Sequence, residues 1–222
     1  MKKTIPAYEQ PLFGALLTMT AGGMDAYSYL LHGKVFAGMQ TGNLILLGIR
    51  LGERQFNLCW RYAISLLAFF AGTLLVRIFQ RNHLFKTHGT KDRQVILLYQ
   101  ALLLILVALL GTHISNFTAT IILSIAAAAE LQAFHQLDGV PFTPLMMTGN
   151  LRTLAETSWD TLAYREVAAK HRLITTLLIF ISFTIGAVIV AVVIPYLGTS
   201  SILIPVAILL LAWLRLAHVQ NF

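Results

Sequence analysis

Six segments of this chain are long and apolar enough to cross a lipid bilayer, and they constrain the fold more than any other feature. They cover residues 12–31, 62–79, 95–110, 117–137, 173–194 and 202–216. A helix needs about 20 apolar residues for one crossing. The chain is 57% hydrophobic and 11% charged, so it cannot bury its apolar side chains in one water-facing core. We expect an all-α, polytopic bundle of transmembrane helices with six full spans.

Two further apolar segments, 35–49 and 140–155, are short and are interrupted by polar residues. Each contains one copy of the same motif, MQTGNL at 39–44 and MMTGNL at 146–151, at a spacing of 107 residues. Glycine lets a helix unwind, and asparagine is a good residue with which to start one. The two segments are therefore expected to be short, broken or re-entrant, beside the six full spans.

The position of the motif divides one membrane domain, residues 1–222, into repeat one at 12–110 and repeat two at 117–216. Each repeat has three full spans, and an odd number places the second repeat in the opposite orientation. Inverted three-span repeats with a broken helix in each half are typical of small transporters. The arrangement leaves a homodimer possible as the working unit.

The distribution of basic residues predicts the orientation. The net charge is +7, and the most basic loop lies at 81–93, so this loop and both termini are expected in the cytoplasm. The segment 34–61 carries four basic residues and one acid, and this model places it outside. Basic residues are not interleaved with aromatic ones, so we expect the partners to be the lipid bilayer and a small solute, with no nucleic acid.

Two acids lie within the expected spans, where a charge costs several kcal/mol and commonly marks function. Asp25 shares a helix face with Thr18 and Gly22, and at the motif spacing it corresponds to Gln132. Asp25 and Glu130 are therefore candidate coupling groups. The alternatives are that Asp25 pins two helices by a hydrogen bond and that Glu130 pairs with a basic residue at a helix contact.

Each Thr-Gly-Asn copy offers a hydroxyl, a flexible backbone and an amide at the positive end of a short helix. We expect two such ends to meet near the midplane and hold a small polar or anionic solute. The alternative is tight packing through small residues four apart. The expected substrate-binding residues are Asp25, Gln40, Thr41, Gly42, Asn43, Gln132, Thr148, Gly149 and Asn150.

Catalytic and metal motifs are missing from the sequence. It contains no Walker motif, nucleophile elbow, zinc signature or dinucleotide fingerprint, and the seven histidines have no spacing suited to a metal. A single cysteine, Cys59, excludes an intrachain disulfide. We expect no enzyme activity, no cofactor and no metal site.

The segments GGMDAYSYL at 22–30 and VFAGMQTGN at 35–43 resemble the YoaK family of bacterial inner-membrane proteins, a domain of unknown function. A second resemblance covers ELQAF at 130–134 and FTPLMMTGNL at 142–151, where the family often has Gly-Leu-Gln and this chain has Glu130. The resemblance implies a multi-span protein of the bacterial cytoplasmic membrane. It implies no particular substrate.

Two classes of function follow. The first is a small transporter or permease for a small polar or anionic solute, with Asp25 and Glu130 as possible ion-coupling groups. The alternative is a non-transporting scaffold or assembly factor, in which the small residues serve packing and the basic loop contacts anionic lipid. An intramembrane enzyme is a third class, but no nucleophile–base pair supports it.

Overall fold

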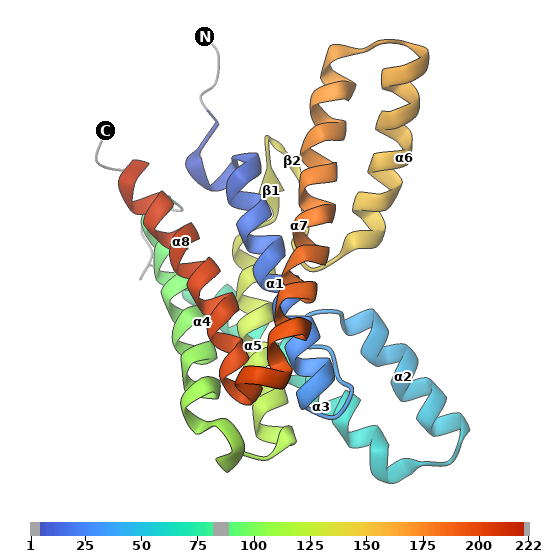
Figure 1. Cartoon of the computed structure of the whole chain (residues 1–222), viewed down its shortest axis with the longest axis vertical. Coiled ribbons are helices and arrows are strands. Elements are labelled where there is room, and N and C mark those ends of the chain that lie inside the picture. The colour runs from blue at the N-terminus through green and yellow to red at the C-terminus, as the bar shows by residue number, and fades with distance from the viewer. Residues whose placement is uncertain (1–4, 82–88, 220–222) are drawn as a thin grey trace.

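The computed structural model describes residues 5–81 and 89–219, and it is a bundle of helices with one short hairpin in that part of the chain (Figure 1). The elements in chain order are η1 (Ala7–Glu9), α1 (Pro11–Leu31), α2 (Gln40–Gly52), α3 (Phe56–Arg81), α4 (Thr90–Leu110), η2 (Gly111–His113), α5 (Asn116–Ala133), β1 (Gln136–Leu137), β2 (Val140–Pro141), α6 (Met147–Ala163), α7 (Val167–Leu197), η3 (Gly198–Ile202) and α8 (Leu203–Val219). The expected all-α class is confirmed.

Helices α1 and α5 form the centre of the bundle. Helix α1 packs against α7 and α8, while α5 packs against α3 and α4. Helices α4 and α8 also contact each other, and α1 contacts α5. The short helices stand at the side of the bundle, α2 against α3 and α6 against α7 (Figure 1). This order leaves α2 and α6 attached mainly through the hairpins that they form with the following helix.

Small residues explain the close packing of α1 against α7. The position that a Cβ would take on Gly22 is occupied by the main-chain oxygen of Phe183. In the same way, Gly186 lies directly against the main-chain oxygen of Met19. Two helices come this close only where neither has a side chain at the contact. The contact between α3 and α5 is similar, because Gly72 lies against the backbone of Ile125.

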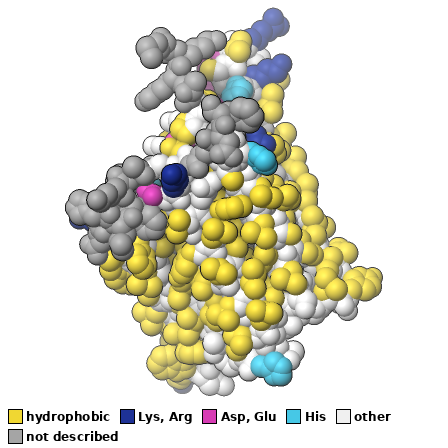
Figure 2. Space-filling view, turned by 90° about the vertical axis from the view of Figure 1, so that its left-hand side faces the viewer, with side chains coloured by type: hydrophobic (Ala, Val, Ile, Leu, Met, Phe, Trp, Pro, Cys, Tyr) yellow, Lys and Arg dark blue, Asp and Glu magenta, His cyan; other side chains and the backbone are white. Residues whose placement is uncertain are grey.

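The outer surface is apolar, as expected of helices in lipid. Large hydrophobic side chains such as Phe70, Leu102 and Val192 are exposed on α3, α4 and α7. Figure 2 shows hydrophobic side chains over most of one face, with basic side chains gathered toward one end. By length and hydropathy, the helical stretches of the described chain that could span a membrane are Phe56–Arg81, Thr90–His113, Asn116–Ala133 and Val167–His218.

These four stretches are candidates for membrane-crossing helices, and the last of them contains both α7 and α8. Helix α1 is not among them, because its buried face carries polar and small residues such as Thr18, Gly23 and Asp25. The expected count of six full spans therefore stays a prediction.

One expected boundary is wrong. The segment 117–137 was expected to be a single span, but α5 ends at Ala133 and the chain turns through the β1–β2 hairpin. Asp138 and Gly139 form the turn with φ angles of 54° and 75°. Two positive φ angles in succession define the tight turn that an Asp-Gly pair favours. The amide N–H of Asp138 also donates to the Glu9 carbonyl oxygen at 2.7 Å, which joins the hairpin to η1.

Some of the basic residues that predict the orientation in the membrane lie outside the described chain. Residues 1–4 and 82–88, which hold Lys2, Lys3 and much of the basic loop, are not described. Within the described residues, the beginning of α1 and the end of α8 lie at the same end of the bundle (Figure 1). Arg215 on α8 donates to the Gln10 side chain at 3.2 Å, which places these two segments side by side.

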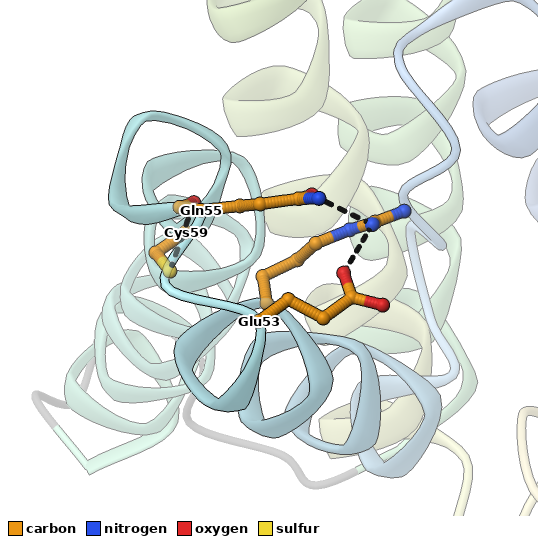
Figure 3. Close-up of polar contacts among 4 residues, drawn as sticks. Glu53, Gln55 and Cys59 are labelled. Carbon is orange, nitrogen blue, oxygen red and sulfur yellow. Dashed lines mark hydrogen bonds and ion pairs between the residues drawn. The ribbon is translucent and has the colours of Figure 1, made fainter.

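The turn between α2 and α3 contains a small polar cluster. Arg50 donates to the carboxylate of Glu53 at 2.7 Å and to the Gln55 side chain at 2.8 Å. Cys59 is half-buried, and its thiol lies 3.6 Å from the Gln55 carbonyl oxygen (Figure 3). These contacts account for one of the basic residues of segment 34–61, since Arg50 is paired within its own turn.

Candidate functional site

The loop that precedes α2 is held by the side chain of Asn43, which is completely buried. Asn43 accepts a hydrogen bond from the Phe36 N–H at 2.9 Å and donates one to the Phe36 carbonyl oxygen at 2.8 Å. Its amide nitrogen also lies 3.0 Å from the Ser65 hydroxyl and 3.0 Å from the Gln40 side-chain oxygen. The first Thr-Gly-Asn copy is thus fixed both to its own loop and to α3.

Asp25 reaches the same loop from α1. Its Oδ1 atom accepts a hydrogen bond from the Gly38 N–H at 2.6 Å, and its Oδ2 atom is buried without a hydrogen-bond partner among the described residues. Beside the loop, the hydroxyls of Ser65 and Ser124 lie 2.8 Å apart and join α3 to α5. The contact with Gly38 agrees with a structural role for Asp25, and the main-chain N–H groups of Ala37 and Met39 also lie close to its carboxylate.

The second Thr-Gly-Asn copy is held differently. Asn150 is half-buried and donates to the Met146 carbonyl oxygen at 3.3 Å and to the Met147 sulfur at 3.6 Å. These hydrogen bonds stay within its own helical turn and do not tie α6 to α7. Thr148 and Gly149 are exposed. The two copies therefore share a sequence but differ in their contacts.

A cavity of about 380 Å³ lies beside Asn150, between the hairpin, α6 and α7. At its edge the His171 ring nitrogen lies 3.1 Å from the Asp138 carboxylate. Arg172 and Ile179 on α7 also line the cavity, so its wall carries polar, basic and apolar groups. The polar residues that line it are Asp138, Asn150, Thr153, His171, Arg172, Thr175 and Thr176.

A pattern on α3 and α7 gives a reason why Asn43 is hydrogen-bonded to α3 whereas Asn150 is not hydrogen-bonded to α7. The spacing Phe-x2-Gly-x3-Val occurs at 69–76 on α3 and again at 183–190 on α7, 114 residues later. At this spacing Ile179 is the counterpart of Ser65. Asn43 therefore meets a hydroxyl on α3, whereas an isoleucine stands at the equivalent position on α7. Among the described residues, the hydrogen bonds of Asn150 go to Met146 and Met147 and not to α7.

The two broken segments meet directly before their helices begin. A Cβ on Gly38 would lie 2.9 Å from a methyl carbon of Leu145, so these residues are in contact. Leu145 is 2% exposed and precedes α6 at the position that Gly38 holds before α2. The two broken segments are therefore neighbours, and a leucine side chain fills the contact between them; that they hold a solute stays a prediction.

Two of the expected site residues line a groove beside α3. Gln40 and Gln132 line an open groove of about 630 Å³ along α3, together with Thr73 and Arg77. Gln132 donates to the Gln80 side chain at 3.1 Å. Its sequence correspondence with Asp25 therefore does not bring it to the same cluster.

Glu130 is fully buried on α5 and is paired with an amide group. Gln100 of α4, also fully buried, donates to its Oε2 atom at 2.6 Å. The alternative expected from the sequence was a basic partner for Glu130, but the partner in the structure is the amide of Gln100. Asp25 lies near enough to interact electrostatically with Glu130.

The expected site residues thus divide into groups. Asp25, Gln40, Gly42 and Asn43 gather at the first break, where a Cβ on Gly42 would crowd the Phe36 ring at 3.1 Å. Thr41, like Thr148 and Gly149, is exposed. Ser65 and Gln100 were not anticipated; each is a polar residue within an apolar stretch of its helix, and this is the only sign of them in the sequence. Within the described residues, no group of three or more His, Cys, Asp or Glu side chains could hold a metal ion.

Comparison with known proteins places this geometry in a family. The model of the family described as "Protein of unknown function (DUF1275)" matches residues 13–214, which include both broken segments. The chain belongs to this family. It is also similar to the UPF0700 transmembrane protein YoaK of Bacillus subtilis (strain 168), with 27% identity over 214 residues and 93% of each chain covered. No solved structure matches the chain. The DUF1275 chain is accordingly a transmembrane protein, and the expected relation to YoaK is confirmed.

Proposed function

We propose that this DUF1275 protein is a small transporter that moves a small polar or anionic solute by alternating access. The observation that carries the proposal is the difference between the two broken segments, 35–49 and 140–155, which we call the first and second gate. Asn43 is fully buried and hydrogen-bonded to α3, whereas Asn150 lies beside a cavity of about 380 Å³. A transporter built from two related gates holds one gate closed while the other is open.

Helix packing supports two inverted repeats, α1–α4 and α5–α8. When each helix is exchanged for its counterpart, the contact of α1 with α7 becomes that of α5 with α3. The contact of α4 with α5 becomes that of α8 with α1, and the α4–α8 contact maps onto itself. In Figure 1, α1 and α5 run in opposite directions along the bundle. On this reading six helices cross the membrane, while α2 and α6 enter from opposite faces.

The lining of the open cavity supports a polar or anionic solute. Arg172 contributes a permanent positive charge, and Asn150 and Thr153 contribute hydrogen-bonding groups. The cavity also lies at the beginning of α6, where unpaired main-chain N–H groups favour negative charge. If both termini are in the cytoplasm of a bacterial cell, this cavity opens toward the cytoplasm.

Replacing Asp25 with asparagine is expected to keep the fold but abolish the ion dependence of uptake. An amide oxygen can still accept the Gly38 N–H, but the side chain can no longer carry a negative charge that binds a cation or a proton. The measurement is uptake of labelled phosphate, sulfate and short carboxylates by proteoliposomes under imposed proton or sodium gradients. Glu156→Gln is the control, because Glu156 is exposed and paired with Arg152 at 2.8 Å.

Two outcomes of the uptake assay count against the proposal at different levels. Unchanged gradient dependence in Asp25→Asn removes Asp25 from the coupling step. Uptake no faster than into empty liposomes, for every solute tried, contradicts transport of this solute class.

A membrane scaffold or assembly factor is the second candidate, and one observation favours it. The outer face of α2 is apolar and exposed at Leu44, Ile45 and Ile49. Such a face could pack against another membrane helix, including one of a second copy of the chain. A scaffold needs no water path, so a cysteine at Thr153 would then stay unreactive toward water-soluble thiol reagents.

A further inference from the structure

The carboxyl group of Glu130 sits in the least polar part of the bundle. It is fully buried next to the run of buried alanines at 126–129. Its one hydrogen bond within the described residues comes from Gln100, whose Nε2 atom lies 2.6 Å from the Glu130 Oε2 atom. The remaining Glu130 oxygen, Oε1, is buried and has no hydrogen-bond partner in the described part of the chain, and the same holds for Oε1 of Gln100.

These two unpartnered oxygens indicate that a hydrogen-bond donor is missing between the two side chains. Two oxygen atoms that only accept hydrogen bonds cannot satisfy each other, and an unpaired buried carboxylate is costly. A proton on Glu130 Oε1 removes both problems at once. The acid O–H can then donate to Gln100 Oε1 while the Gln100 N–H continues to donate to Glu130 Oε2, which closes a two-bond acid–amide pair. We infer that Glu130 carries a proton in this state and that the Glu130–Gln100 pair is the proton-binding site of the protein.

The charged groups around Glu130 support this assignment. Helix α5 packs against α1, α3 and α4. From α1, Asp25 acts on Glu130 as a second acid, and like charges disfavour two ionised carboxylates. Arg77 on α3 and the neighbours Asp92 and Arg93 on α4 line a separate cavity next to Ala133, one helical turn beyond Glu130.

That separate cavity gives the proton a route to water. It measures about 260 Å³ and lies between α3, α4 and the end of α5. Its wall includes Ile96 and Ala133, which stand one helical turn from Gln100 and Glu130 respectively. His135 and Asp92 also line it, so its wall carries polar groups. The acid–amide pair therefore lies one helical turn from the wall of this cavity on both α4 and α5.

A proton held in this way can couple to transport, and this role rests on the proposed function. Breaking the Glu130 O–H bond passes the proton to a water molecule in the cavity and leaves a carboxylate. That carboxylate faces the Gln100 oxygen and interacts with Asp25, so proton release destabilises this packing of α1, α4 and α5. Loss of the proton would thus favour a different arrangement of the two repeats.

Infrared spectroscopy of the purified protein at neutral pH tests the proton directly. We expect a carbonyl stretch of a protonated carboxylic acid in the wild type, shifting in D2O, and its loss in Glu130→Gln. The variant should fold, because the new amide N–H can donate to Gln100 in place of the acid O–H. Glu156→Gln, at an exposed ion pair, should leave the band unchanged. Absence of a Glu130-dependent band in the folded wild type overturns the assignment.

A second variant separates a proton from a charge. In Gln100→Leu a protonated Glu130 loses its hydrogen bonds but remains neutral, so the band should persist at a higher frequency. If Glu130 were instead ionised in the wild type, removing its hydrogen-bond donor would drive it to take up a proton, so the band would be absent from the wild type and would appear only in the variant. This readout needs no solute. If the band is present but uptake is never observed, the proton site stands and the transport proposal fails; if sodium rather than protons drives uptake and no band is seen, the proton site fails alone.

Discussion

Replacing Gly186 with alanine is expected to lower the free energy of unfolding by about 3 kcal/mol, because an added methyl group has no space at this contact. The Cβ atom would collide with the main-chain oxygen of Met19, and a backbone atom cannot move aside as a side chain can. The α1–α7 contact is the most extensive helix pairing in the bundle, so the two helices would have to separate. The same result is expected for Gly22→Ala, which meets the main-chain oxygen of Phe183.

Gly48→Ala is the matched control for this prediction. Gly48 lies within α2, and a Cβ there would meet no atom within 4 Å. Alanine favours a helix over glycine by about 1 kcal/mol, so this variant should be at least as stable as the wild type. Both are measured as thermal unfolding in detergent. A Gly186→Ala protein as stable as the Gly48→Ala protein would contradict the close approach of α1 and α7.

The two motif asparagines should respond very differently to the same substitution. Asn43→Ala is expected to cost about 3 kcal/mol, since it leaves the Phe36 N–H without its partner, removes one of the two donors to the Phe36 carbonyl oxygen and removes the contact with Ser65. Asn150→Ala should change stability by less than about 0.5 kcal/mol, because Asn150 bonds only within its own half-buried turn. The measurement is again unfolding in detergent, on both variants side by side.

Asn43→Asp provides a further control. A carboxylate can accept the Phe36 N–H but cannot donate to the Phe36 carbonyl oxygen, so it should be as damaging as alanine. Equal losses of stability at Asn43 and Asn150 would mean that the two breaks are in the same state. The proposed difference between a closed and an open gate would then be wrong.

The sequence was a good guide to the helices but not to their ends. The apolar run 173–194 lies within α7, and the two motif copies begin α2 and α6, because glycine and asparagine together are favoured in turns and at the start of a helix. The run 117–137 gave a wrong helix end, since its last apolar residues belong to the hairpin. The pair Asp138-Gly139 was the available signal for that turn.

The candidate site was harder to predict because the two copies have the same sequence in different surroundings. Nothing in the motif distinguishes Asn43 from Asn150; the difference lies in Ser65 and Ile179, which stand on other helices. Similarly, Glu130 reads as an isolated acid until the fold brings Gln100 to it from α4. Contacts of this kind depend on how helices pair, and periodicity within one helix does not reveal them.

The proposed mechanism requires that one gate is closed while the related gate in the other repeat is open. Thiol accessibility from each side of the membrane tests this requirement most directly. In a Cys59→Ser background, cysteine replaces Thr153, which lines the open cavity, or Ser65, which is fully buried behind Asn43. We predict that a membrane-impermeant thiol reagent labels Thr153→Cys from the side that carries the chain termini and leaves Ser65→Cys unlabelled. Conditions that protect Thr153→Cys should expose Ser65→Cys to the opposite side. Labelling of both positions from one side, or of neither under any condition, would contradict the account.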